Sequence, residues 1–352
     1  MARFHLNRRS PDEEFPDLRR NATLMGQILT PAMYRRQFHR CTDSGVIFDD
    51  VIRPGLEEPG ERCGPVSAGC VAGDAQSYIL FCDFFDRVIE AYHKHKVDRS
   101  HSCLVLQGSE DLDRSYVLGC EMTIVRSVED YCFPIHCSRG ERRQLLQLAK
   151  RGIASLQRFG EEDLPGQLHL LKDLDQEQQC ALKLSPPSQF QLRTGAARDW
   201  PDARAVWLSD DNSLVVWINI EDHLKLVTTR HDADLGVIYS QLRHPFIWKQ
   251  QLGWLSSSPT EVGTGFRVRI KLRLKLLPTQ RRLQDVLIRL RLHMVSTGTA
   301  STGVYTVSNA GTFGESEVAL TQLVVDGVKL LVNMEKILEK NGDIDELVPS
   351  QK

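Results

Sequence analysis

The sequence predicts an α+β fold in which a small all-helical N-terminal domain precedes a large domain with an antiparallel sheet flanked by helices. Two observations favour this fold class. In the first hundred residues apolar side chains recur at helical spacing, whereas from about residue 168 onward short strand-like segments follow one another along the chain. Because strands that follow strands favour antiparallel pairing, the sheet is expected to be mixed but largely antiparallel.

The chain is long enough for two domains, with 352 residues of which 41% are hydrophobic and 26% charged. Residues 1–22 are polar and contain two prolines, so we expect a flexible arm there. Residues 23–98 form the predicted helical domain, and residues 114–352 form the predicted large domain. Residues 99–113 are charged and lack periodicity, and we assign them as the linker between the two.

Helix start and stop signals define the elements of the first domain. Thr30 can cap a helix that has Pro31 at its first position. Pro54 and Gly55 are expected to stop the next, short helix. In chain order the predicted elements are a helix through Phe38, a short helix over 47–52, a mobile Gly/Pro-rich loop over 57–69, and a longer helix after Gly73 and Asp74 with an apolar stripe over 79–89.

The large domain combines three predicted helices with seven predicted strands. The helices cover 141–159, 176–184 and a long last segment that Ser316 caps and Gly342 stops. The strands lie near 168–171, 203–208, 213–220, 223–229, 266–273, 287–294 and 303–308.

One buried strand ends in a polar cluster. Residues 214–219 are mostly apolar, β-branched or aromatic, and Glu221, Asp222, His223 and Lys225 follow directly. If the strand continues, Glu221 and His223 project to one side and Asp222 to the other. A carboxylate at the edge of a packed sheet suits acid/base chemistry or the binding of a cation. The alternative is a strand end that simply meets water.

Two strands with alternating basic residues indicate a possible phosphate-binding face. The strand over 266–274 is apolar on one face, and residues 288–293 repeat its pattern. The other face of the first strand presents Arg267, Arg269, Lys271 and Arg273. Small residues at 263–265 and 296–299 would let backbone amides approach an anion such as a nucleotide phosphate. The alternative is a solvated sheet face, and the chain lacks the phosphate-binding motif G-x-x-x-x-G-K-[ST].

Charge and composition exclude several classes of protein. The formal net charge of −2 predicts neither a nucleic-acid nor a membrane partner. No apolar run approaches the roughly 20 residues that a membrane helix needs. The first nine residues have no apolar core for a signal peptide, and acids from Asp12 onward argue against a transit peptide, so a cytoplasmic location is expected. The nine cysteines show no metal-ligand spacing and are expected to be reduced, with no metal site.

Several longer motifs resemble the phosphagen (ATP:guanido) kinases, nearest to the vertebrate cytosolic creatine kinases. The motifs occur in both predicted domains, and the resemblance covers residues 24–352. They are Phe48-Asp49-Asp50-Val51-Ile52, Gly69-Cys70-Val71-Ala72-Gly73-Asp74, Cys137-Ser138-Arg139-Gly140-Glu141-Arg142-Arg143, Asp199-Trp200-Pro201-Asp202-Ala203-Arg204, Glu221-Asp222-His223-Leu224 and Val324-Val325-Asp326-Gly327-Val328-Lys329-Leu330.

The resemblance implies the fold class predicted above, together with a reaction. In that reaction the γ-phosphoryl group of MgATP moves reversibly to the guanidino nitrogen of creatine or a related guanidino compound. ATP or ADP with Mg²⁺ is the implied cofactor, and a homodimer, or a heterodimer with related kinases, is the implied assembly. Catalysis in the family depends on alignment and on arginines around the phosphates, with carboxylates that orient the guanidinium.

Only some of the family's site residues are kept in this sequence. Glu221 matches one catalytic carboxylate. Arg126 and Arg267 match phosphate-binding arginines, and Lys225 replaces another, keeping the charge without the bidentate fork. The small-residue loop that includes Thr297 and Gly298 is the remaining predicted contact to the nucleotide.

Most of the other matching positions have changed. The replacements are Glu121, Thr123 and Val295 for arginines, Thr306 for an aspartate, Ser258 for the reactive cysteine, Glu261 for an asparagine and Ile220 for a carboxylate. The chain is also shorter than the family pattern within 184–189 and 231–244. We therefore expect phosphoryl transfer to be lost or severely weakened. The alternative is a functional creatine kinase of low activity.

Overall fold

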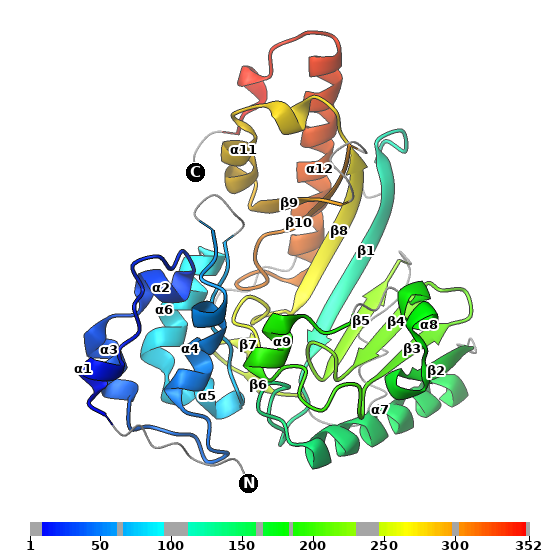
Figure 1. The fold of residues 1–352 in the computed structure, drawn as a ribbon. Coiled ribbons are helices and arrows are strands. Elements are labelled where there is room, and N and C mark those ends of the chain that lie inside the picture. Colours follow the sequence, from blue (N-terminus) through cyan, green and yellow to red (C-terminus); the bar gives the residue numbers. More distant parts are fainter. Residues whose placement is uncertain are drawn as a thin grey trace.

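The computed structural model describes residues 9–61, 66–94, 112–159, 165–182, 186–229, 246–297 and 303–349. A helical N-terminal region lies beside a much larger region built on one long sheet (Figure 1). The predicted α+β fold class is therefore confirmed. Of the predicted linker, only residues 112–113 lie within the described residues, so the domain boundaries stay a prediction.

Six short helices form the part of the small domain that the structure describes. They are α1 (Pro11–Glu14), α2 (Leu24–Ile28), α3 (Pro31–Gln37), α4 (Phe48–Glu57), α5 (Ala75–Leu80) and α6 (Cys82–His93). Aromatic rings pack at their centre, where Phe48 lies 5.3 Å from both Phe81 and Phe84 between ring centroids. Thr30 caps α3 as predicted, since its hydroxyl accepts the N–H of Met33.

Two details of the small domain differ from the prediction. Helix α4 continues past Pro54 to Glu57, because the N–H of Glu58 donates to the Pro54 carbonyl and extends the helical turn. The longer helix predicted after Asp74 is instead two helices that meet at Phe81, whose side chain is fully buried. The residue at which a helix ends depends on local contacts of this kind, which the spacing of apolar residues in the sequence does not reveal.

The large domain contains an eight-stranded sheet in the order β2-β3-β4-β5-β1-β8-β10-β9, with every neighbouring pair antiparallel. Its strands are β1 (Val117–Arg126), β2 (Gly166–Leu170), β3 (Ala205–Ser209), β4 (Leu214–Ile218), β5 (Leu224–Thr228), β8 (Phe266–Arg273), β9 (Leu292–Ser296) and β10 (Val304–Asn309). A two-residue ladder joins β6 (Trp248–Lys249) to β7 (Gly253–Trp254). The predicted antiparallel sheet is confirmed, although the pattern alone did not identify the central strand β1.

Helices of the large domain lie around this sheet, and α9 packs against α4 of the small domain (Figure 1). The helices are α7 (Arg139–Phe159), α8 (Gln176–Ala181), α9 (Gln189–Thr194), α11 (Leu283–Arg289) and α12 (Glu317–Glu339), with single 3₁₀ turns η2 (Leu171–Asp173), η3 (Leu277–Thr279) and η5 (Asp345–Leu347). The buried faces of α7 and α12 belong to the same apolar core as the sheet strands. In the described residues, no helix is both long and apolar enough to cross a membrane.

The strand predicted over 287–294 is wrong. Residues up to Arg289 belong to α11, and Arg291 adopts a left-handed φ of 55° before β9 begins at Leu292. The alternating apolar residues misled the prediction, because Ile288 is 55% exposed and the buried residues of α11 follow helical spacing instead. The second basic strand face therefore does not exist.

A buried carboxylate joins α12 to the end of β8. Glu335 is 1% exposed, and its Oε1 accepts the N–H groups of Lys275 and Leu276 at 2.6 and 2.9 Å. Its Oε2 accepts the N–H of Leu277 at 2.7 Å. One side chain thus satisfies three consecutive backbone donors where the chain leaves the sheet, so it fixes the last helix against the core.

Replacing this carboxylate is expected to destabilise the fold. Glu335→Ala should lower the free energy of unfolding by about 3 kcal/mol or more, because each buried donor left without a partner costs about 1–3 kcal/mol. The measurement is the midpoint of urea denaturation. Glu339→Ala, one turn along the same helix on an exposed residue, is the matched control and should cost less than about 1 kcal/mol. Equal losses in the two variants would contradict this role of Glu335.

Candidate active site

Three of the predicted site residues lie on neighbouring central strands. Strand β1 lies between β5 and β8, and at its end Arg126 pairs in register with Leu224 and Val125 with Lys225 of β5. On the other side of β1, Thr123 lies opposite Arg267. Thr297 is not part of this group, because it follows Ser296, which is in register with Tyr305 and, through it, with Leu272 near the other end of β8.

Glu221 and Lys225 form an ion pair across the connection between β4 and β5. Lys225 Nζ lies 2.5 Å from Glu221 Oε2 and 5.6 Å from the centre of the Trp217 ring. The side chain of Glu221 is 52% exposed, whereas that of Lys225 is 17% exposed. Glu221 is thus accessible to a ligand, but its charge is already matched by the neighbouring ammonium.

The strand-based prediction for residues 221–223 is wrong in its geometry. Strand β4 ends at Ile218, and the chain bends through 221–223 with a left-handed φ of 57° at Asn219. Glu221 is exposed while His223 is 1% exposed, so the two do not share one side. A bend replaces the alternation because the N–H of Asn219 donates to the His223 carbonyl at 3.0 Å.

His223 is a structural residue of this bend. Its Nδ1 accepts the N–H of Val128 at 3.0 Å, and its Nε2 therefore carries the proton donated to the Cys132 carbonyl at 2.8 Å. Burial lowers the pKa of His223 to about 4, so the ring is neutral near pH 7. With both nitrogens engaged, the ring holds residues 128–132 in place.

Asp222 points to the opposite side, toward the small domain. It is 5% exposed, and its Oδ1 accepts the N–H of Ser257 at 2.9 Å. Burial raises the pKa of Asp222 to about 7. The neighbouring carbonyls bind the small domain, since Ser257 accepts the N–H of Ala72 at 2.8 Å and Ser256 accepts the Tyr78 hydroxyl at 2.9 Å. No local pattern in the sequence indicates this perturbed carboxyl group, because its burial depends on residues far away in the chain.

Arg126 supports the loop that precedes β8. It is 6% exposed, and its Nη1 donates to the Thr264 carbonyl at 2.7 Å and to its own Val125 carbonyl at 2.8 Å. Its guanidinium carbon lies 4.6 Å from the centre of the Trp254 ring. Arg126, which is predicted to bind phosphate, therefore stabilises this loop in the structure.

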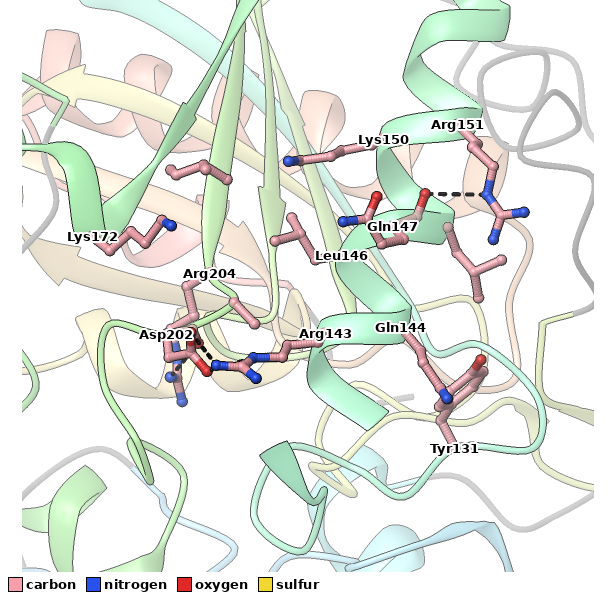
Figure 2. Close-up of a pocket in the computed structure, with 13 residues that line it drawn as sticks. Tyr131, Arg143, Gln144, Leu146, Gln147, Lys150, Arg151, Lys172, Asp202 and Arg204 are labelled. Atoms are coloured by element: carbon pink, nitrogen blue, oxygen red, sulfur yellow. Dashed lines mark hydrogen bonds and ion pairs between the residues drawn. The ribbon is translucent and has the colours of Figure 1, made fainter. Parts of the chain in front are cut away.

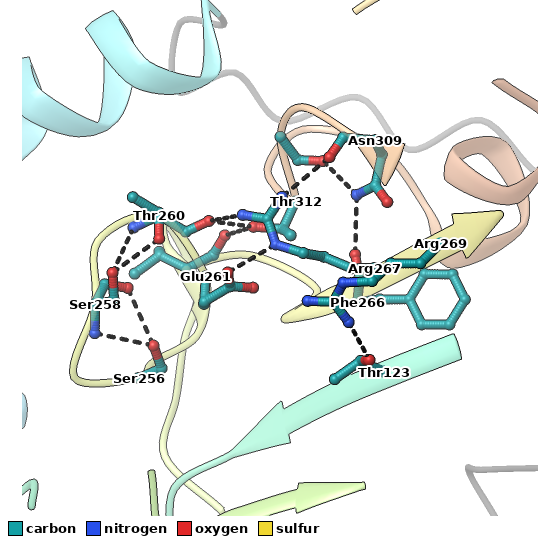
Figure 3. A network of polar contacts seen from close by, with 12 residues as sticks. Thr123, Ser256, Ser258, Thr260, Glu261, Phe266, Arg267, Arg269, Asn309 and Thr312 are labelled. Carbon is teal, nitrogen blue, oxygen red and sulfur yellow. Dashed lines mark hydrogen bonds and ion pairs between the residues drawn. The ribbon is translucent and has the colours of Figure 1, made fainter. Parts of the chain in front are cut away.

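Arg267 is engaged by groups of the protein itself (Figure 3). It is 7% exposed, and its Nε donates to Glu261 Oε1 at 2.7 Å. Its two Nη atoms donate to the carbonyls of Thr260 and Asn309 at 2.9 and 3.0 Å. A carboxylate thus occupies the guanidinium edge that a phosphate would need.

Arg269 is engaged in a similar way on the next pair of the β1–β8 ladder. Its Nη1 lies 3.4 Å from Glu121 Oε1 and donates a short hydrogen bond to the Thr123 hydroxyl (Figure 3). Glu121 and Thr123 of β1 are therefore both bonded to an arginine of the neighbouring strand.

The remaining predicted contacts lie on the loop between β9 and β10. Thr297 is exposed, and its hydroxyl lies 2.9 Å from that of Thr306 on the neighbouring strand. Gly298 lies outside the described residues. The hydroxyl of Ser258, for which the resemblance implies the loss of a reactive cysteine, lies 2.8 Å from the Thr260 hydroxyl.

Comparison with known proteins assigns the class of protein that this fold and site define. ATP:guanido phosphotransferase, N-terminal domain, matches residues 19–90, and ATP:guanido phosphotransferase, C-terminal catalytic domain, matches residues 147–338. The chain belongs to the ATP:guanido phosphotransferase family, the phosphagen kinases.

Within this family the chain is creatine kinase-like. It is 40% identical to creatine kinase M-type of Rattus norvegicus, in an alignment that covers 99% of this chain and 98% of that protein. Creatine kinase M-type of Homo sapiens is 39% identical with the same coverage.

Solved structures agree. A lombricine kinase has a TM-score of 0.83 and 30% identity, covering 98% of this chain and all of that one. The duplicated taurocyamine kinase from Schistosoma mansoni, at 20% identity and a TM-score of 0.77, shares the fold over 92% of this chain and 48% of its own.

Asp222 and His223 are both buried, and they change the stability of the folded protein with pH in opposite directions. The folded protein keeps the Asp222 proton up to about pH 7, whereas the unfolded chain releases it near the ordinary value of 3.8. The folded state then binds more protons between these values, so this contribution to stability falls as the pH rises. For His223 the folded pKa is about 4 against 6.5 unfolded, so its contribution rises with pH over that range.

Asp222→Asn should isolate the first contribution. Asparagine keeps an acceptor for Ser257 but cannot ionise, so the variant should gain roughly 2 kcal/mol relative to the parent protein between pH 5 and pH 8. Chemical denaturation at both pH values measures this difference. Asp285→Asn, on an exposed residue of α11, is the control and should show no such gain. A pH-independent difference for Asp222→Asn would mean that the carboxylate is ionised throughout.

Proposed function

We propose that this creatine kinase-like protein has lost most or all phosphoryl transfer and acts by binding. One observation carries the proposal: three cations near the site are paired with carboxylates of the protein. Arg267 pairs with Glu261 at 2.7 Å and Arg269 with Glu121 at 3.4 Å. The third pair is Lys225 with Glu221 at 2.5 Å.

These pairs oppose the binding of a nucleotide triphosphate. Phosphoryl transfer relies on positive charge that is preorganised around the moving group. Here Glu121 and Glu261 would each lie beside the phosphates, and neutralising or displacing them costs free energy. Loss of a single stabilising donor from such a site can slow a reaction by about 10²–10³. The described residues therefore fit MgATP or MgADP poorly.

The substitution of Ser258 for the reactive cysteine supports the same proposal. A serine hydroxyl does not form the anion that a thiol forms near neutral pH. In addition, Ser258 is hydrogen-bonded within its own loop: its hydroxyl bonds to that of Thr260, and its backbone N–H donates to the Ser256 hydroxyl at 3.1 Å. Creatine or another guanidino compound would thus meet a loop whose polar groups are occupied.

The alternative function is a working creatine kinase of low activity. It is favoured by the exposure of Glu221, the one family carboxylate kept at this position, and by the retention of Arg126 and Arg267. In that case nucleotide binding would have to break the Arg267–Glu261 pair. The two functions differ in whether nucleotide breaks the Arg267–Glu261 pair at the concentrations found in cells.

Nucleotide binding and turnover distinguish them. At millimolar MgADP we expect no rise in melting temperature, because a ligand stabilises a protein only if it binds the native state. A coupled assay with ATP and creatine should likewise give no turnover above background. A measurable kcat that disappears in Glu221→Gln would establish the working enzyme and reject our proposal.

A variant that restores positive charge tests whether charge pairing is the reason that the parent protein does not bind nucleotide. Glu121→Arg should increase the stabilisation by MgADP, since it removes the carboxylate opposite Arg269 and adds a phosphate-binding group. Glu346→Arg makes the same change of charge on an exposed residue of η5 and serves as the control. If Glu121→Arg folds normally and still shows no nucleotide effect, charge pairing is not what prevents binding.

Dimerisation and a cytoplasmic location remain predictions that rest on the family. We expect a homodimer, or a heterodimer with an active relative, with no nucleic-acid or membrane partner. Multi-angle light scattering of the purified full chain should give about twice the mass of the 40.0 kDa chain. A monomer at micromolar concentration would contradict the homodimer and leave pairing with a relative to be tested by mixing the two proteins.

A further inference from the structure

A groove of about 750 Å³ lies on the large domain between α7 and the strands β2 and β3 (Figure 2). The candidate active site uses none of the residues that line it. Its lining comes from α7 between residues 143 and 151, from the end of β2 with η2, from residues 202–204 before β3, and from Tyr131. The volume is in the range of sites that hold small organic ligands, roughly 300–1,000 Å³.

The groove is strongly basic. The charged residues that line it are Arg143, Lys150, Arg151, Lys172, Arg204 and Asp202. Five cations thus face one carboxylate, and Asp202 already pairs with Arg139 at 2.7 Å and with Arg143 at 3.1 Å. Among the described residues, neither Lys150 nor Lys172 has an ion-pair partner. In Figure 2 these two side chains extend from opposite walls toward the space between them.

Arg204 adds a buried positive charge beneath the groove. It is 1% exposed, and its Nη atoms donate to the carbonyls of Ala196, Arg198 and Asp202. Its guanidinium carbon lies 4.8 Å from the centre of the Trp200 ring, and its Nε is buried with no hydrogen-bond partner in the described structure. Burial lowers the pKa of Arg204 to about 10, so it remains charged near pH 7.

The positive charges are combined with apolar surface. Tyr131, Leu146, Leu148 and Leu170 also line the groove. Along α7, Arg143 and Lys150 are seven residues apart, which is about 10 Å at the helical rise of 1.5 Å per residue. This separation suits a ligand with several anionic groups or with an anionic end and an apolar body. A cleft lined by one sign of charge concentrates such ligands.

We propose that this groove is a binding site for a small organic phosphate or polyphosphate, with its anionic groups held by Lys150 and Lys172 and its apolar part on the leucine side chains. The groove differs from the candidate active site in how its cations are paired. Carboxylates pair with Arg267, Arg269 and Lys225 at the site, whereas Lys150 and Lys172 in the groove have no carboxylate partner among the described residues.

Isothermal titration of the full chain with tripolyphosphate and with adenosine monophosphate, without Mg²⁺, tests the proposal. We expect saturable binding that weakens as salt concentration rises. The double variant Lys150→Glu/Lys172→Glu should bind at least about tenfold more weakly, which corresponds to about 1.4 kcal/mol. Lys249→Glu/Lys340→Glu changes the net charge equally on exposed residues elsewhere and should bind like the parent protein.

Three results would overturn the proposal. These are no binding of either probe at millimolar concentration, equal weakening in the two double variants, and binding of a hexaglutamate peptide in preference to both phosphates, which would indicate a protein partner. Lys225→Gln should leave groove binding unchanged. If instead that substitution abolishes binding, the phosphate occupies the candidate active site, and both the groove and the proposed loss of nucleotide binding are rejected.

Discussion

The register of β1 against β8 is the constraint on which the rest of this site depends. It places Val268 and Ile270 in the core, and on alternate positions it sets Thr123 opposite Arg267 and Glu121 opposite Arg269. A strand cannot slip by one residue without exchanging its buried and polar faces. The same packing that stabilises the sheet therefore forces an acidic side chain of β1 against a basic side chain of β8, and the local charge is balanced within the protein.

The small domain completes the site by holding its loops. His93, at the end of α6, is 3% exposed; its Nε2 contacts the Pro259 carbonyl at 3.1 Å, and its Nδ1 accepts the N–H of Thr312 at 3.3 Å. On the same side, the small domain bonds Ser256 and Ser257, next to the buried Asp222. The loop over 256–262 is thus fixed between the domains, and the carbonyl of its residue Thr260 fixes Arg267 in turn.

Charge is distributed unevenly over the large domain. Carboxylates pair with Arg267, Arg269 and Lys225 at the end of the central strands, and Arg291 pairs with Glu315 at 3.1 Å. The groove along α7 keeps an excess of positive charge instead. Because surface potential reflects the sum of nearby charges, the two regions attract anions very differently although they belong to one sheet.

The sequence by itself determined the fold class, six of the seven predicted strands, the long helices and, through its motifs, the family, because periodicity and capping are local properties. Its motifs also predict that Glu221, Arg126, Lys225 and Arg267 belong to one site, and these roles stay a prediction. Tertiary structure decided the rest. Only packing could show that residues 283–289 are helical, that His223 is buried while Glu221 is exposed, and that Glu261 and Glu121 engage Arg267 and Arg269. These outcomes depend on contacts between segments far apart in the chain, which no local pattern records.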